Sequence, residues 1–188
     1  HYLPDSDLFH QITEPRIAGR HLPSGLDVGT ALGSPLAADK LREQTVGFPQ
    51  VAPNAEAFGK AMKLDGIYGS WLQTLRTLFD QPAGLPDFAK TPTYEAKQLN
   101  CCLTSWAHLR HNYILYGAQA NTCAGVGGAS PGLVEPLPGF FAAYGKLCRE
   151  LREKLVACRI DGRSVIVLDL LEKKAATFER CATDQLAG

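Results

Sequence analysis

Two histidines stand three positions apart, in the run His108-Leu109-Arg110-His111. Residues with this spacing share one face of a helix, so both imidazoles can reach a single metal ion. A zinc site needs three or four protein ligands, however, and zinc-protease helices use H-E-x-x-H, with four-residue spacing and a glutamate base. Neither condition is met. His108 and His111 are therefore a candidate metal pair whose simpler interpretation is one hydrogen-bonded core histidine and one exposed histidine.

A second candidate group lies on the same segment and contains Trp106, Arg110 and Tyr113. Arg110 follows Trp106 by one helical turn, a spacing at which a guanidinium can stack on an indole. The group is either part of a binding pocket or, as the simpler interpretation, an internal packing contact.

Other catalytic signatures are missing from the sequence. The glycines of Gly125-Val126-Gly127-Gly128 are not followed by Gly-Lys-Ser/Thr, and no strand is predicted before them, so they indicate a loop and not a phosphate site. The spacing Gly-x-Ser-x-Gly occurs at Gly128-Ala129-Ser130-Pro131-Gly132, but it lies inside a glycine- and proline-rich stretch with no predicted strand before it, so it lacks the strand–turn–helix context of a nucleophile elbow. No recognisable cysteine–histidine nucleophile motif occurs. We therefore assign no catalytic residue and no cofactor, and we favour a protein that is not an enzyme.

The elements that carry these residues are predicted to be helices, in one all-α domain spanning residues 1–188. Residues 93–119 are apolar on most sides, as expected of the central helix of an irregular bundle. Residues 124–138 are rich in glycine and proline and predict a long surface loop. Beyond it, two amphipathic segments around the turn signal Asp161-Gly162 predict a C-terminal helical hairpin. Short helices, begun by caps at Ser24 and Ser34, fill the first fifty residues.

Composition limits the classes of function. The chain has 188 residues, 45% of them apolar, and its 19 basic and 19 acidic residues give no net charge. A chain this long buries roughly 70% of its unfolded surface, so it can fold as a globular domain. The zero net charge argues against nucleic-acid binding, and no apolar run reaches the ~18 residues of a membrane span.

The six cysteines lack the spacing of a zinc site and are either buried thiols or disulfides. The predicted hairpin allows one geometric comparison. With the turn at Asp161-Gly162, Cys148 and Cys181 are offset by about five residues, or roughly 7.5 Å, whereas Cys158 and Cys181 are offset by roughly 22 Å. If a disulfide joins the two helices, we expect it to be Cys148–Cys181.

Several stretches, in order along residues 4–147, resemble the family known as domain of unknown function 3160. The matching segments are Pro4-Asp5-Ser6-Asp7-Leu8-Phe9, Leu22-Pro23-Ser24-Gly25-Leu26-Asp27-Val28, Ala31-Leu32-Gly33-Ser34, Leu99-Asn100, Ser105-Trp106-Ala107, Leu109-Arg110-His111, Ile114-Leu115-Tyr116 and Val134-Glu135-Pro136 with Pro138 and Phe140. The family usually has glutamate at the position of His108 and aspartate at that of Asn112. The Cys101-Cys102 pair is not part of the family pattern.

The resemblance implies a secreted or extracellular protein, and implies that this chain, which begins at His1, is a fragment or processed part of a longer one. It also favours oxidised cysteines. No activity comes with it.

Three functions stay open. The first is a non-catalytic helical domain that packs against the rest of its precursor or against a partner protein. The second is a hydrolase whose cleft is lined by residues 106–116, with Asp27 and Glu135 as acid or base partners of the histidines. The third is a carbohydrate or cell-surface binding module, which would display Trp71 or Trp106 on its surface.

Overall fold

A computed structural model describes residues 3–13, 20–114, 134–160 and 162–187. The helices are α1 (Ser6–Thr13), α2 (Gly25–Ala31), α3 (Pro35–Gln44), α4 (Val51–Ala61), α5 (Gly66–Arg76), α6 (Pro92–Ile114), α7 (Pro138–Ala157) and α8 (Arg163–Ala187), with short 3-10 helices η1 (Thr77–Phe79) and η2 (Asp87–Lys90) between α5 and α6. No strand occurs in these four ranges. The prediction of an all-α bundle is confirmed.

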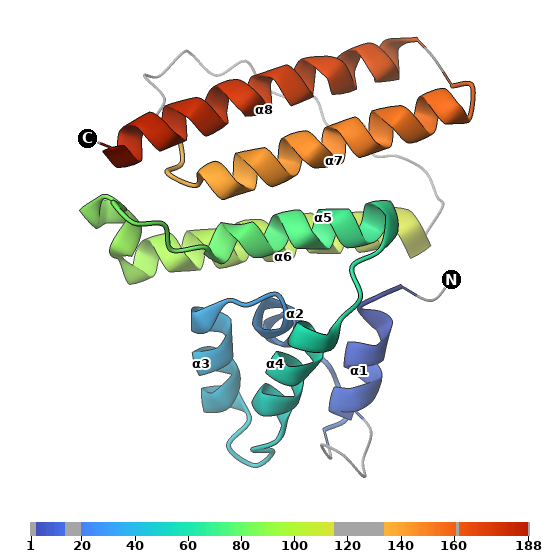
Figure 1. The fold of residues 1–188 in the computed structure, drawn as a ribbon. Helices are drawn as coiled ribbons and strands as arrows, with labels where there is room; N and C mark the ends of the chain where they lie inside the picture. Colours follow the sequence, from blue (N-terminus) through green and yellow to red (C-terminus); the bar gives the residue numbers. More distant parts are fainter. Residues whose placement is uncertain (1–2, 14–19, 115–133, 161, 188) are drawn as a thin grey trace, which may run out of the picture.

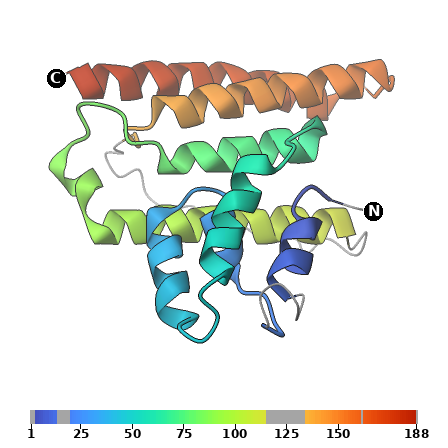
Figure 2. The same ribbon diagram turned by 60° about the horizontal axis from the view of Figure 1, so that its bottom comes forward.

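The helices form three tiers (Figure 1). The short helices α1–α4 make the lowest tier, α5 and α6 the middle one, and the α7–α8 hairpin lies above α5. Figure 2 shows that the turn between α7 and α8 reaches past the neighbouring ends of α5 and α6. The predicted C-terminal hairpin is therefore present, and its turn projects from the bundle.

The local signals for helix starts act as expected. The Ser24 side chain accepts a hydrogen bond from the Leu26 amide, and the Ser34 side chain accepts one from Ala37 ahead of α3. Proline follows Ser34 at the first helical position, where its missing N–H has no intrahelical partner to lose. These caps fix where α2 and α3 begin.

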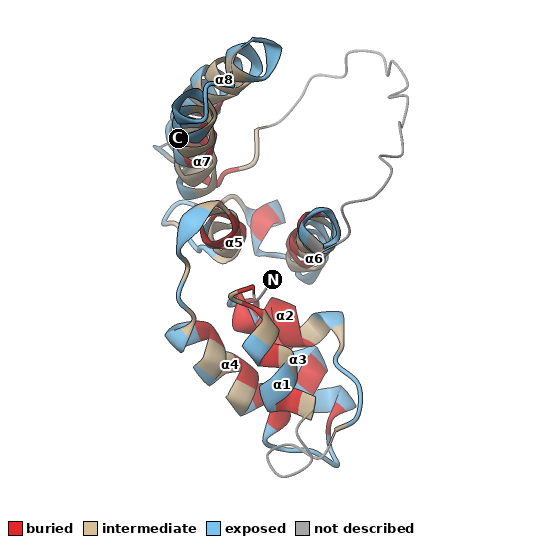
Figure 3. Ribbon diagram, turned by 90° about the vertical axis from the view of Figure 1, so that its right-hand side faces the viewer, coloured by how far each residue is buried: buried red, intermediate tan, exposed pale blue. Residues whose placement is uncertain are grey.

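The main core lies between the lowest and middle tiers, where Leu8, Ile12, Leu41 and Leu72 are fully buried (Figure 3). At Gly59, α4 approaches α2 so closely that an added Cβ would lie 2.0 Å from the carbonyl oxygen of Ala31. Only glycine allows this approach.

The central helix differs from the prediction in one respect. The sequence predicted a helix over residues 93–119 that is apolar on most sides. The structure describes α6 over 92–114, and residues 115–119 lie outside the described ranges. Most of the predicted 124–138 loop also lies outside them. One face of α6 is exposed, because the tiers cover it from one side only; that face includes Asn100, Cys101, Thr104, Ala107, His108 and His111.

The register of the hairpin separates the two cysteines expected to pair. Gly145 lies against Ala175, and Arg149 bonds Glu172 at 2.7 Å, so Cys148 is nearly level with Glu172. Cys181 lies nine positions further along α8, roughly 13 Å at ~1.5 Å per residue, too far for a disulfide. Both are free thiols, as are the other three described cysteines, so the structure does not support the Cys148–Cys181 pairing.

Within the described ranges, every helix is too short or too polar to span a bilayer.

Candidate functional site

The aromatic and basic group predicted on α6 is gathered around a buried carboxylate. Asp5, just before α1, is 2% exposed. Its Oδ2 accepts hydrogen bonds from the Tyr68 hydroxyl at 2.9 Å and from the Trp106 indole N–H at 2.7 Å, and its Oδ1 accepts one from Arg110 Nη1 at 2.8 Å. The carboxylate therefore ties α1 to both α5 and α6. We call Asp5, Tyr68, Trp106 and Arg110 the Asp5 cluster.

Aromatic rings enclose the Asp5 cluster. The Arg110 guanidinium lies 5.0 Å from the centroid of the Phe9 ring, so it stacks on Phe9 and not on Trp106 as its spacing suggested. Tyr113, 43% exposed, packs edge-on against Tyr68 with centroids 5.0 Å apart. Burial, followed by the nearby Asp5 charge, raises the pKa of Tyr68.

The arrangement has the features of a structural anchor. Each oxygen of Asp5 already has a donor, and the Arg110 charge is neutralised by the carboxylate it contacts. Sequence reasoning placed Trp106, Arg110 and Tyr113 together but missed Asp5 and Tyr68. The only sequence signal at Asp5 was its position before a helix, which is typical of a capping residue.

The two candidate metal ligands lie at the surface. His108 and His111 are both exposed on α6, and neither imidazole has a hydrogen bond or ion pair with a described residue. The described ranges contain no cluster of three or more histidine, cysteine, aspartate or glutamate side chains suited to a metal ion. The metal pair stays a prediction without a third ligand in the described part of the chain.

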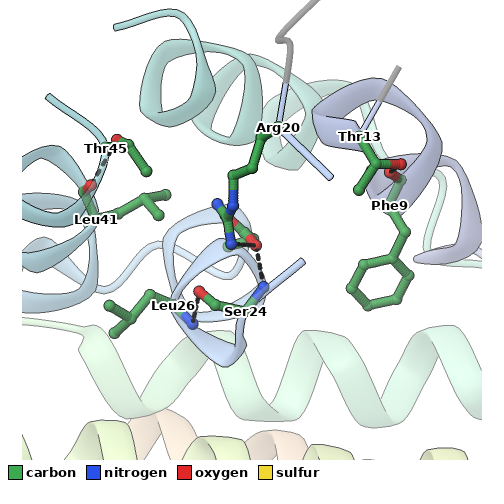
Figure 4. A network of polar contacts seen from close by, with 8 residues as sticks. Phe9, Thr13, Arg20, Ser24, Leu26, Leu41 and Thr45 are labelled. Carbon is green, nitrogen blue, oxygen red and sulfur yellow. Dashed lines mark hydrogen bonds and ion pairs between the residues drawn. The ribbon is translucent and has the colours of Figure 1, made fainter. Parts of the chain in front are cut away.

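The carboxylates considered for acid–base chemistry have other partners. Asp27 is fully buried and receives a bidentate ion pair from Arg20, at 2.8 and 3.0 Å, together with the Ser24 amide at 2.5 Å. Figure 4 shows Arg20 reaching over the start of α2 beside Ser24. Glu135 accepts a hydrogen bond from the Tyr94 hydroxyl at 2.6 Å and pairs with a lysine of α6. Neither carboxylate is joined to a histidine.

A cleft of about 650 Å³ opens where α2, α3, α4 and η1 meet, and Arg76 lines it. The Arg76 guanidinium donates to the carbonyl of Ala31 at 3.3 Å and to that of Gly59, in the last turns of α2 and α4. Helix C-termini carry partial negative charge, which explains how a cation is held there with no carboxylate within ion-pair distance in the described structure. Burial lowers the pKa of Arg76. Its contacts make it a shared cap of two helices.

Five of the eleven large apolar side chains that are exposed among the described residues lie at the turn end of the α7–α8 hairpin. We call this the tip surface: Val156, Ile160, Ile166, Val167 and Leu170, which are 44–69% exposed. A shallow hollow lies beside it, lined by Val156, Ala157 and Val165 together with the charged residues Arg152 and Glu153. Among the described residues next to this turn, Lys154, Arg159 and Arg163 are exposed and have no carboxylate partner.

The tryptophans were expected to be exposed in a carbohydrate-binding module. Both are half-buried, and both indole N–H groups donate to acceptors inside the bundle. The Trp71 N–H donates to the Ser105 hydroxyl at 3.0 Å, and the Trp106 N–H donates to the Asp5 carboxylate. Neither ring presents a free polar edge for a sugar.

Comparison with known proteins gives a family but no activity. The sequence matches a protein family described as "Protein of unknown function (DUF3160)" over residues 1–188, a longer span than the 4–147 of the sequence resemblance. No curated protein and no solved structure matches the chain. The chain belongs to the DUF3160 family.

Proposed function

We propose that this chain is a non-catalytic helical domain of an exported protein that packs against another polypeptide, either the rest of a longer precursor or a partner chain. The observation that carries the proposal is the tip surface. Scattered exposed apolar residues are ordinary, but five gathered at one projecting turn are typical of a protein contact.

The free energy gained by burying the tip surface is large enough to hold a contact. Burying a branched aliphatic side chain completely contributes ~1.5–3 kcal/mol, and the five side chains are about half exposed. Covering them would therefore contribute on the order of 5 kcal/mol before the entropic cost of association. That is enough for a weak intermolecular contact, or for a stable one within a single polypeptide.

The other two functions lack comparable support. A hydrolase needs an acid or base near a nucleophile or bound water. The described histidines lie at the surface without a carboxylate, and Asp27 is enclosed by Arg20 and a helix cap. The indole N–H groups that a sugar would contact are bonded internally. Export, which the family resemblance implies, forms part of the proposal.

The proposal is tested by placing a photo-crosslinking amino acid at Ile166 in the protein as its source organism produces it. A matched probe at Thr183, which is exposed on the same helix away from the turn, serves as the control. We expect Ile166 to crosslink to one defined polypeptide segment, identified by mass spectrometry, while Thr183 does not. No crosslink at Ile166, or the same products from both positions, would refute docking at the tip surface.

A further inference from the structure

The turn that carries the tip surface contains an unfavourable backbone conformation. Arg159 has φ = 58° and is the non-glycine residue with positive φ in the described ranges. The Ile160 amide bonds the Leu155 carbonyl at 2.9 Å, and the Arg159 amide bonds Val156 at 2.9 Å, which places Arg159 at the left-handed position that ends α7. Glycine is the usual residue there, because a Cβ makes the left-handed conformation unfavourable.

A second basic residue occupies a position that helix electrostatics disfavours. Arg163 is the first residue of α8, and the first turn of α8 holds no acidic residue. The N-terminus of a helix carries partial positive charge, so an acidic residue there stabilises and a cation destabilises. Arg163 is exposed and has no carboxylate partner among the described residues.

By sequence, residues 153–163 carry three basic and two acidic side chains, a net charge of +1. Lys154, Arg159 and Arg163 are exposed there and have no ion-pair partner among the described residues. Glu153 is exposed in the same stretch, and Asp161 lies outside the described ranges. Arg159 and Arg163 stand at positions where another residue would make the helix ends more stable. Contacts among the described residues do not explain either position, and the two arginines adjoin Ile160 and Ile166 of the tip surface.

We propose that the occupant of the tip surface is a protein surface with an apolar centre bordered by carboxylates, and that Arg159 and Arg163 pair with those carboxylates. This rests on the proposed docking function and specifies the partner's chemistry. The basic border disfavours a second copy of this chain, because two such turns would repel each other. Because ion pairs at the rim of a contact are exposed to solvent, added salt should weaken the attraction between these arginines and the partner's carboxylates.

The discriminating variants are Arg159→Gly and Arg163→Gln. Glycine relieves the left-handed strain, so Arg159→Gly should raise the melting temperature of the free chain by about 2–4 °C. Arg163→Gln should leave it unchanged or slightly higher. Each variant should nevertheless weaken partner binding, because a rim ion pair contributes about 1.4- to 5-fold in affinity. If Arg159 had only a structural role, Arg159→Gly would change the melting temperature of the chain without weakening partner binding.

Binding is measured with two amphipathic helical peptides that share one leucine face, one flanked by glutamates and the other by lysines. We expect the glutamate peptide to bind the chain roughly tenfold more tightly at low salt, and the preference to shrink in 0.5 M NaCl. Arg159→Gly/Arg163→Gln should remove most of the preference, while Arg180→Glu, an exposed charge near the other end of α8, should leave it intact.

Several outcomes would overturn the inference: equal affinity for the two peptides, binding of neither, or no effect of the double variant. Tighter binding to vesicles containing phosphatidylglycerol than to the glutamate peptide would identify a membrane surface as the occupant. A dimer detected by light scattering, lost in Ile166→Ser, would identify a second copy. If the Ile166 crosslink still finds a polypeptide while the peptides bind equally, docking stands and only the charge inference fails.

Discussion

Removing the Asp5 carboxylate should destabilise the bundle more than any single surface change. In Asp5→Ala, Arg110 loses its carboxylate, and the Tyr68 hydroxyl and Trp106 N–H lose their acceptor. A hydrogen bond to a charged partner contributes ~1.5–3 kcal/mol, and breaking a buried ion pair from one side costs about 3–5 kcal/mol. The Arg110 side chain is 22% exposed, so water replaces part of what it loses.

We therefore expect Asp5→Ala to lower the free energy of unfolding by roughly 3–5 kcal/mol, which corresponds to a fall of about 6–20 °C in melting temperature. Tyr68→Phe removes only the hydrogen bond of 2.9 Å and should cost ~1 kcal/mol. The assay is urea unfolding followed by circular dichroism, with Asp184→Asn as a control because Asp184 is exposed on α8. That control should change stability by less than ~0.5 kcal/mol.

The double variant Asp5→Ala/Tyr68→Phe tests whether the two groups act together. Once the carboxylate is gone, loss of the Tyr68 hydroxyl should cost little, so the two single effects should not add. The reasoning is refuted if Asp5→Ala is no more destabilising than Asp184→Asn. Strict additivity of Asp5→Ala and Tyr68→Phe would show that their hydrogen bond contributes nothing.

Two further predictions concern close packing and thiol reactivity. Gly59→Ala should destabilise the fold by about 1–3 kcal/mol, since its Cβ would lie 2.0 Å from the Ala31 carbonyl oxygen, while Gly47→Ala, with nothing within 4 Å, should be nearly neutral in the same thermal unfolding assay. In the native protein at pH 8, iodoacetamide should modify the exposed Cys101 and spare Cys102, which is fully buried and whose pKa burial raises to about 12. Peptide mapping that finds both thiols equally labelled would contradict this.

Local patterns predicted the elements that depend on neighbouring residues. Ser24 and Ser34 begin helices because a serine hydroxyl satisfies a free amide within three positions. The amphipathic spacing of the last fifty residues predicted a hairpin for the same reason, since a helix needs one apolar face to pack. These features require no knowledge of the rest of the chain.

Contacts between distant segments were not predictable in this way. Asp5 meets Tyr68 and Arg110, 63 and 105 positions away, and nothing in the run around Asp5 specifies either partner. The hairpin register was wrong for a related reason. The register was counted about the turn signal Asp161-Gly162, whereas α7 ends at Ala157 and α8 begins at Arg163, so the connection is centred slightly earlier in the chain. Both Arg159 and Gly162 have positive φ there.

That error bears directly on function. The signal Asp161-Gly162 does fall between the two helices, but the positive φ at Arg159, a position where glycine is usual, left the end of α7 without a sequence signal. The same arginine lies next to Ile160 of the tip surface. Elsewhere, charges withdrawn from water have partners that explain them: Asp27 has Arg20, and Arg76 has two helix ends. Arg159 has neither an ion-pair partner nor a favourable backbone conformation among the described residues, which is why we propose a partner for it on another polypeptide. The affinity and melting temperature of Arg159→Gly, moving in opposite directions, would support that proposal, because strain retained only for folding would be relieved without loss of binding.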